Sequence, residues 1–304
     1  MKLIESKSEY IPQEEGLEGI YKQIELAGRT AYHSQDKITP DSAKGFVDRM
    51  IKSKHGAALE HGTVYFNRKV DNSDLGYLDF EGFFARNPYS KFDYEGDILY
   101  VVTNFRVIEE NFNLKDFWKR NIQYLCSPTE FHERRYTMRF TCSRAIAQEL
   151  TRHRVFSFLM ESQRYINYSK ERHGGEITFI KPTWLNCTYE DIPMESELCY
   201  LARQYPTDEA AHRFIASLVE SKYAYMTLLQ KGCQPQQARD VLPNATKTEL
   251  IMTGFASDWR FLMDLRLFEK TGKVAPDMKV LMQKAWKEFE NYGITRDLER
   301  YIKL

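Results

Sequence analysis

The sequence is poor in cysteine, carries no net charge and has no long apolar run, and each absence excludes a class of protein. Five cysteines in 304 residues, none in a Cys-x-x-Cys pair, exclude a disulfide framework and a cysteine zinc site and predict free thiols in a reducing compartment. The 43 basic and 43 acidic residues cancel, which gives no support for binding to nucleic acid or to an anionic membrane. No segment approaches the ~18 apolar residues of a membrane span, and the first residues lack the apolar core of a signal peptide. We therefore expect a soluble, cytoplasmic protein.

Two common site motifs are missing as well. There is no Gly-x-Gly-x-x-Gly fingerprint for a dinucleotide on a Rossmann fold. His55, Glu60 and His61 come close together, but their spacing is not His-Glu-x-x-His, so we predict no metal site. No linker, repeat or low-complexity run interrupts the chain, which favours a single domain over residues 1–304. Residues 71–97, rich in Asp, Gly, Phe and Tyr, are predicted to be a loop or insertion within that domain.

What is present predicts a folded α/β (α+β) protein. The hydrophobic content of 42% and the aromatic content of 14% are enough for a sizeable core. Apolar periodicity predicts helices at residues 17–32, 39–51, 114–126, 143–151, 208–231 and 277–292, and strands at 63–70, 98–104, 136–142 and 176–182. Thr246 to Glu249 has the Thr-x-x-Glu pattern of a capping box, and it predicts a further helix that runs on toward Arg266.

The stretch from Arg152 to Tyr165 fits neither a helical nor a strand period. It holds three arginines, one histidine, one glutamate and two serines, interleaved with apolar side chains. A guanidinium offers a planar fork of donors that suits phosphate and carboxylate oxygens. The composition predicts a pocket for a flat, anionic ligand; a basic surface loop beside a core segment is the alternative.

Two blocks of sequence carry a resemblance to a known family. Arg152-His153-Arg154, followed after seven residues by Ser162 and then by Gln163-Arg164-Tyr165, resembles the signature of the flavin-dependent thymidylate synthases. Residues 238–243, Ala-Arg-Asp-Val-Leu-Pro, are similar to the Ala-Arg-x-Val-Leu-Pro motif of that family. The resemblance covers roughly residues 16–292 and implies the family's fold, a mixed sheet flanked by helices.

The resemblance also implies the reaction and the residues that carry it. The expected reaction is the reductive methylation of dUMP to dTMP, with FAD as cofactor and with NADPH and 5,10-methylenetetrahydrofolate as co-substrates. We expect a homotetramer with its active sites at subunit interfaces, and no nucleic-acid or membrane partner. The catalytic candidate is Arg266, whose charge held against the uracil would stabilise negative charge there and make C5 electron-rich. Substrate binding is expected from Glu149, Arg152, Glu161, Ser162, Gln163, Arg164, Arg239 and Arg266, and cofactor binding from His55, Glu60, Arg152, His153, Arg154 and Met160.

Within this set, Arg164 and Arg239 suit the phosphate of the nucleotide, because a phosphate favours bidentate donors. Ser162 lacks an identifiable base, which favours a positioning role over that of a nucleophile.

Some positions depart from the family pattern, and Met160, Phe255 and Ser257 among them leave alternatives open. Met160 stands where the family often has glutamine or glutamate, and Phe255 and Ser257 replace an asparagine and an arginine used near the adenine end of the flavin. One alternative is therefore a related pyrimidine-nucleotide methyltransferase or hydroxymethyltransferase on the same scaffold. The other is a non-enzymatic RNA-binding module that uses arginine and aromatic stacking, against which the neutral charge argues.

Overall fold

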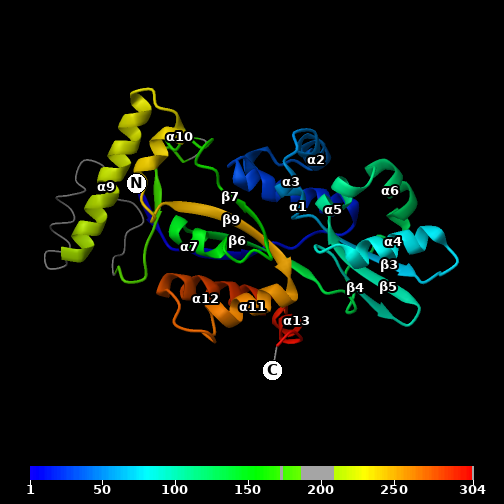
Figure 1. Cartoon of the computed structure of the whole chain (residues 1–304). Coiled ribbons are helices and arrows are strands. Elements are labelled where there is room, and N and C mark those ends of the chain that lie inside the picture. Colours follow the sequence, from blue (N-terminus) through cyan, green and yellow to red (C-terminus); the bar gives the residue numbers. More distant parts are fainter. Residues whose placement is uncertain (172–173, 186–208, 303–304) are drawn as a thin grey trace.

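The computed structural model describes residues 1–171, 174–185 and 209–302, and it has the mixed α/β architecture that the sequence predicts (Figure 1). The described strands are β1 (Lys2–Ile4), β2 (Lys7–Tyr10), β3 (Thr63–Lys69), β4 (Lys91–Glu95), β5 (Ile98–Asn104), β6 (Arg135–Ser143), β7 (Ser157–Met160), β8 (Thr178–Ile180) and β9 (Lys247–Phe255). The described helices are α1 (Gly16–Ala31), α2 (Ser42–Lys52), α3 (Gly56–Leu59), α4 (Leu75–Arg86), α5 (Phe105–Asn111), α6 (Leu114–Asn121), α7 (Arg144–Leu150), α9 (Glu209–Gln230), α10 (Pro235–Ala238), α11 (Ala256–Arg266), α12 (Pro276–Asn291) and α13 (Thr295–Glu299).

The centre of the molecule is a four-stranded antiparallel sheet in the order β2-β6-β9-β7. One face is apolar: Met138 and Phe140 of β6 and Met252 of β9 are fully buried against α7, α11 and α12. Figure 1 shows α11 and α12 along this side of the sheet. Trp259 of α11 lies at the centre of this core, and its indole nitrogen donates to the Tyr136 carbonyl at 3.0 Å.

The opposite face of the same sheet is polar and is covered by α1 and α3. Successive side chains in a strand alternate between the two faces, so the residues between the core positions of β6 and β9 all point to this side. Thr137 and Thr253 hydrogen-bond each other here through their hydroxyls at 2.8 Å. On β9 this face also carries Lys247 and Glu249.

Two smaller sheets complete the described fold. The antiparallel sheet β3-β5-β4 packs with α4, α5 and α6 around an aromatic cluster centred on Phe66 and Phe105. Strands β1 and β8 pair in parallel, and their side chains Leu3 and Phe179 pack with those of α9.

The predicted helix at Thr246 is wrong, because these residues begin strand β9. Thr248, Leu250 and Met252 are buried, whereas Lys247 and Glu249 face the other side, which is the period of a strand. The helix begins only at Ala256, where the Asp258 carboxylate accepts a hydrogen bond from the Phe255 amide at 3.2 Å.

The prediction of a loop at residues 71–97 is also wrong, since this segment forms helix α4 and strand β4. The Asp74 side chain caps α4 by accepting from the Gly76 amide at 2.8 Å, and β4 pairs with β5. Smaller differences concern element ends: α2 begins at Ser42 and not at Thr39, and the helix predicted to reach residue 126 gives way to a 3-10 turn after Asn121.

Candidate functional site

The Arg-His-Arg stretch is the turn that joins helix α7 to strand β7. Ser143 caps the helix by accepting from the Ile146 amide at 3.3 Å, and the His153 amide then bonds the Leu150 carbonyl as the helix ends. Arg152 and Arg154 are exposed, whereas Phe156 is buried with its ring 4.8 Å from that of Trp259. The sequence from Arg152 to Tyr165 lacks a single period because it contains this turn, strand β7 and a second turn.

His153 contacts Arg266, which lies at the end of α11. The Arg266 Nε donates a hydrogen bond to His153 Nε2 at 3.1 Å, across 113 positions of sequence. Burial, with the positive charge of Arg266, lowers the pKa of His153 to about 4. The imidazole is therefore neutral at physiological pH and carries its proton on Nδ1, because Nε2 is the acceptor.

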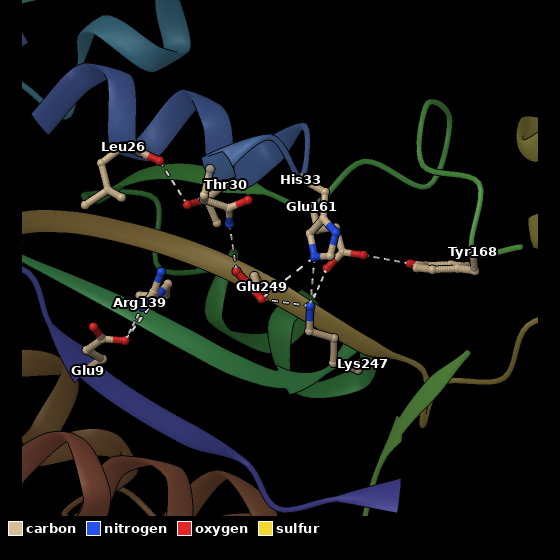
Figure 2. Close-up of polar contacts among 10 residues, drawn as sticks. Glu9, Leu26, Thr30, His33, Arg139, Glu161, Tyr168, Lys247 and Glu249 are labelled. Atoms are coloured by element: carbon tan, nitrogen blue, oxygen red, sulfur yellow. Dashed lines mark hydrogen bonds and ion pairs between the residues drawn. The ribbon is translucent and has the colours of Figure 1, made fainter. Parts of the chain in front are cut away.

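A second group of polar residues lies where β7, β9 and the end of α1 meet (Figure 2). Glu161 is buried, and its carboxylate accepts from Lys247 Nζ at 3.0 Å and from the Tyr168 hydroxyl at 2.8 Å. Lys247 also donates to Glu249 at 2.9 Å, and His33 lies 4.0 Å from the same carboxylate. Burial by itself lowers the pKa of Lys247, but the two carboxylates outweigh it and the pKa is raised. Lys247 is thus a charged member of the site.

Sequence reasoning missed Lys247 and Glu249 because the strand that presents them was taken for a helix. Residues 247–249 are all polar and residues 250–252 all apolar, so no alternation identifies them; the β-branched Thr248, Ile251 and Thr253 are the signal that favours a strand.

The turn that carries Ser162 is fixed by backbone hydrogen bonds on both sides. The Glu161 amide donates to the Glu249 carbonyl at 2.8 Å and the Ser162 amide to the Ala31 carbonyl at 3.0 Å. Gln163 is buried, and its Nε2 has no hydrogen-bond partner in the described part of the chain. Arg164 is exposed, with its guanidinium carbon 5.4 Å from the Tyr165 ring centroid.

A cavity of about 620 Å³ opens beside this face, between β6, β7, α3, α5 and the segment before β4. Glu60 and Arg154, both predicted to bind the cofactor, line it together with Arg135 and Phe255. Glu60 also accepts a hydrogen bond from Arg106 Nη1 at 2.6 Å. The volume is within the usual range for a bound organic ligand, roughly 300–1,000 Å³.

The remaining predicted residues lie further apart. His55 precedes α3 and lies 3.3 Å from the Tyr32 hydroxyl, Glu149 is on α7, and Met160 packs against the apolar core of the sheet. Arg239 lies in a 3-10 turn after α10, its side chain 39% exposed and its Nε 3.9 Å from Asp240.

Within the described residues, neither Arg164 nor Arg266 forms an ion pair with a carboxylate, and Arg239 has only Asp240, at 3.9 Å. Nor does that part of the chain contain a group of three or more His, Cys, Asp or Glu side chains placed to hold a metal ion. Among the helices described, none has the length and apolar character needed to cross a membrane.

Comparison with known proteins identifies the family. The family model described as "Thymidylate synthase complementing protein" matches residues 89–292. The chain belongs to this family. The resemblance seen in the Arg-His-Arg and Ala-Arg-x-Val-Leu-Pro motifs is thereby confirmed.

The curated relatives that the chain matches carry the same name. A flavin-dependent thymidylate synthase from Pyrococcus furiosus is 28% identical over 162 residues, 53% of this chain and 55% of that protein. The chain thus spans about half the length of the first curated relatives that it matches. Another, from Mycolicibacterium vanbaalenii, is 34% identical over 261 residues, 85% of this chain and 72% of that protein. Among solved structures, a UMP/dUMP methylase from Streptomyces cacaoi bound with 5-Br dUMP is 16% identical, with a TM-score of 0.40 over 97% of this chain and 99% of the other. A TM-score this low supports no comparison of sites.

Proposed function

We propose that this protein is a flavin-dependent thymidylate synthase that methylates dUMP at C5 to give dTMP. The observation that carries the proposal is the hydrogen bond between Arg266 and His153, since it joins the predicted catalytic arginine to the family signature. Membership of the family and the names of the curated relatives support the same reaction.

Arg266 is suited to activate the pyrimidine. Its Nε is bound to His153, whereas none of the described residues accepts a hydrogen bond from either Nη atom. Both terminal nitrogens are therefore available to donate to a uracil carbonyl oxygen beside N3. A cation fixed at that edge stabilises negative charge on the ring and raises the electron density at C5, which is an electrostatic form of catalysis. The neutral His153 holds the guanidinium in place without adding a competing charge.

The cavity lined by Glu60 and Arg154 fits a flavin cofactor. It has the volume for an organic ligand, and it contains guanidinium groups that no carboxylate of the described residues neutralises. When bound, reduced FAD supplies the hydride, while methylenetetrahydrofolate supplies the carbon and NADPH the electrons. The chain's own contribution is to hold the flavin with Arg154 and Glu60 and to place Arg152 and His153 between the cofactor and the substrate.

The phosphate of dUMP is assigned to Arg164 and Arg239, with Ser162 positioning the nucleotide. Arg164 is exposed and the side chain of Arg239 is 39% exposed on the described chain, so a second copy can approach both. We therefore place the complete site at a contact between copies of the chain, in a homotetramer whose neighbouring subunits supply the two halves.

The test is an anaerobic assay on purified, FAD-loaded protein. Bleaching of the flavin by NADPH is followed with and without dUMP, and methylenetetrahydrofolate is then added. We expect reoxidation of the flavin with formation of dTMP and tetrahydrofolate. Bound flavin without dTMP from dUMP would contradict the proposal.

A related pyrimidine-nucleotide methyltransferase is the second candidate, and the position of Met160 favours it. This side chain is apolar and packs against the core, so it cannot make the polar contact of a glutamine or glutamate. Turnover of UMP or dCMP in place of dUMP in the same assay would select this candidate. Membership of an enzyme family gives the RNA-binding alternative no support.

A further inference from the structure

The cavity contains a buried cation without an anionic partner. Arg135, the first residue of β6, is only 9% exposed and lines the cavity. Its Nη1 donates to the Glu60 carbonyl at 3.1 Å and its Nη2 to the Ser157 hydroxyl at 3.4 Å. Its Nε has no hydrogen-bond partner, and no carboxylate oxygen of the described residues lies within 4.0 Å of the guanidinium. A buried charge of this kind is unfavourable unless an anion compensates it.

The other basic side chains of the cavity differ, because most are already neutralised. Arg106 forms ion pairs with Glu60 and Glu110 at 2.6 and 2.7 Å. Lys91 forms one with Glu133 at 2.7 Å.

The uncompensated groups of the cavity are Arg135, Arg154 and Asp258. No ion pair with Arg154 occurs in the described part of the chain, and burial raises the pKa of Asp258. With Lys91 and Arg106 already paired, the positive charge of Arg135 and Arg154 favours the binding of an anion in the cavity.

One wall of this cavity comes from the segment predicted to be a loop or insertion, and it is formed by Asn87, Pro88, Tyr89 and Lys91. From this wall the Lys91 ammonium donates to the Ser257 hydroxyl at 2.8 Å and lies 4.5 Å from the Phe255 ring centroid. Arg135 lies 5.5 Å from the same ring. Phe255 and Ser257 both depart from the family pattern. Lys91 of β4 contacts both of them, and Arg135 of β6 lies near Phe255.

We propose that Arg135, with Lys91 beside it, binds the diphosphate of the flavin dinucleotide in this cavity. A guanidinium presents several donors to phosphate oxygens, and Lys91, whose charge Glu133 balances, adds the ammonium N–H that Glu133 and Ser257 do not use. The inference rests on the proposed function, because it takes FAD as the cofactor. NADPH also carries a diphosphate, so the experiment has to separate the two dinucleotides.

The experiment titrates the full-length apoprotein with FAD and, separately, with riboflavin, which has the same ring but no phosphate. Flavin fluorescence reports the dissociation constants, and a competition titration gives that of NADPH. Arg135→Gln should weaken FAD binding at least tenfold and leave riboflavin binding unchanged, whereas Arg135→Lys should lose less. Lys91→Gln should weaken FAD binding about threefold. Arg120→Gln, which removes an exposed arginine of α6 outside the cavity, is the control and should change neither constant.

The possible results separate this inference from the proposed function. Unchanged FAD affinity in Arg135→Gln, or an equal loss for FAD and riboflavin, overturns the role of Arg135 while dTMP formation still supports the enzyme. If Arg135→Gln loses NADPH binding but binds FAD normally, Arg135 binds the diphosphate of NADPH, and the inference is overturned. Wild-type protein that binds no FAD overturns both. If Arg135→Gln does not fold, Lys91→Gln decides, and an unchanged affinity for FAD in that variant rejects the inference.

Discussion

Arg266 at the end of α11 donates a hydrogen bond to Nε2 of His153 in the turn after α7, at 3.1 Å. The acceptor role of that nitrogen requires a neutral imidazole, and the lowered pKa of His153, about 4, agrees with it. The pair fixes the orientation of the arginine while leaving its terminal nitrogens unoccupied by the described residues. This arrangement is expected of an arginine that binds a ligand, and not of one whose main role is to stabilise the fold.

Replacing Arg266 by Ala should abolish methylation while the protein stays folded. Loss of a fixed charge that stabilises a transition state typically costs about 10²–10³ in turnover. Arg266 is only half-buried, so the midpoint of thermal unfolding should change little. The assay measures dTMP formed per minute at saturating dUMP, with circular dichroism as the check on folding. Near-normal turnover in this variant would remove Arg266 from the catalytic role.

The stability of the protein should fall as the pH is lowered below 6.5, in part because of His61. This side chain is fully buried, bonded through Nδ1 to the Thr253 hydroxyl at 2.8 Å, and burial followed by the charge of Arg135 lowers its pKa to about 3. The unfolded chain, with a histidine pKa near 6.5, binds more protons than the folded one between pH 6.5 and 3, so stability decreases with falling pH in that window. One such group accounts for about 2 kcal/mol between pH 6.5 and 5, at ~1.4 kcal/mol per unit.

Urea denaturation at pH 7 and pH 5 measures this effect. His61→Gln should lose that part of the pH dependence, whatever its stability at pH 7. His55→Gln, which changes an exposed histidine, is the control and should keep the wild-type difference. A pH dependence that is the same in all three proteins would mean that His61 titrates normally.

Lys247 and Glu161 should behave as a coupled, buried ion pair. Their atoms lie 3.0 Å apart with 13% and 0% of the two side chains exposed. Lys247→Met leaves the Glu161 carboxylate without its cation, and breaking a buried pair in this way typically costs about 3–5 kcal/mol. The double variant with Glu161→Gln should be destabilised by less than the sum of the two single changes.

The free energies of unfolding of the four proteins complete this cycle. Lys44→Met is the control, because it breaks an exposed ion pair with Asp48 on α2 and should cost less than about 1 kcal/mol. Additive effects of Lys247→Met and Glu161→Gln would mean that the two groups do not interact.

The sequence predicts the elements whose periods are unambiguous and fails where a local pattern has two meanings. Strand β6 follows from the alternation of Tyr136, Met138 and Phe140 with polar residues. The beginning of β9 has no such alternation, because residues 247–249 are all polar, and Thr246 to Glu249 matches a capping box. In the fold, Lys247 lies on a strand and pairs with Glu161 on a distant turn. Tertiary contacts therefore decide between the two.

Local motifs likewise predict single residues of the site, whereas the contacts between those residues depend on the fold. The motifs identify Arg266 and His153 separately, yet no spacing rule brings together residues 113 positions apart. Arg135 gave no signal at all, because an arginine that begins an alternating strand resembles an ordinary surface residue. Only the three-dimensional arrangement shows that no carboxylate of the described residues pairs with it.

Mixing two inactive variants should restore activity if subunits share the site. Arg239→Gln should remove the phosphate contact and Arg266→Ala the catalytic cation, so each homo-oligomer alone should be inactive or nearly so. If each site takes Arg239 from one subunit and Arg266 from another, random reassembly leaves both wild-type residues in about a quarter of the sites. We therefore expect about a quarter of wild-type dTMP formation after the two variants are unfolded together and refolded. Variants refolded separately and then combined in the assay are the control. A mixture that never exceeds that control would place both arginines of a site on the same chain, because every site would then carry one of the two substitutions.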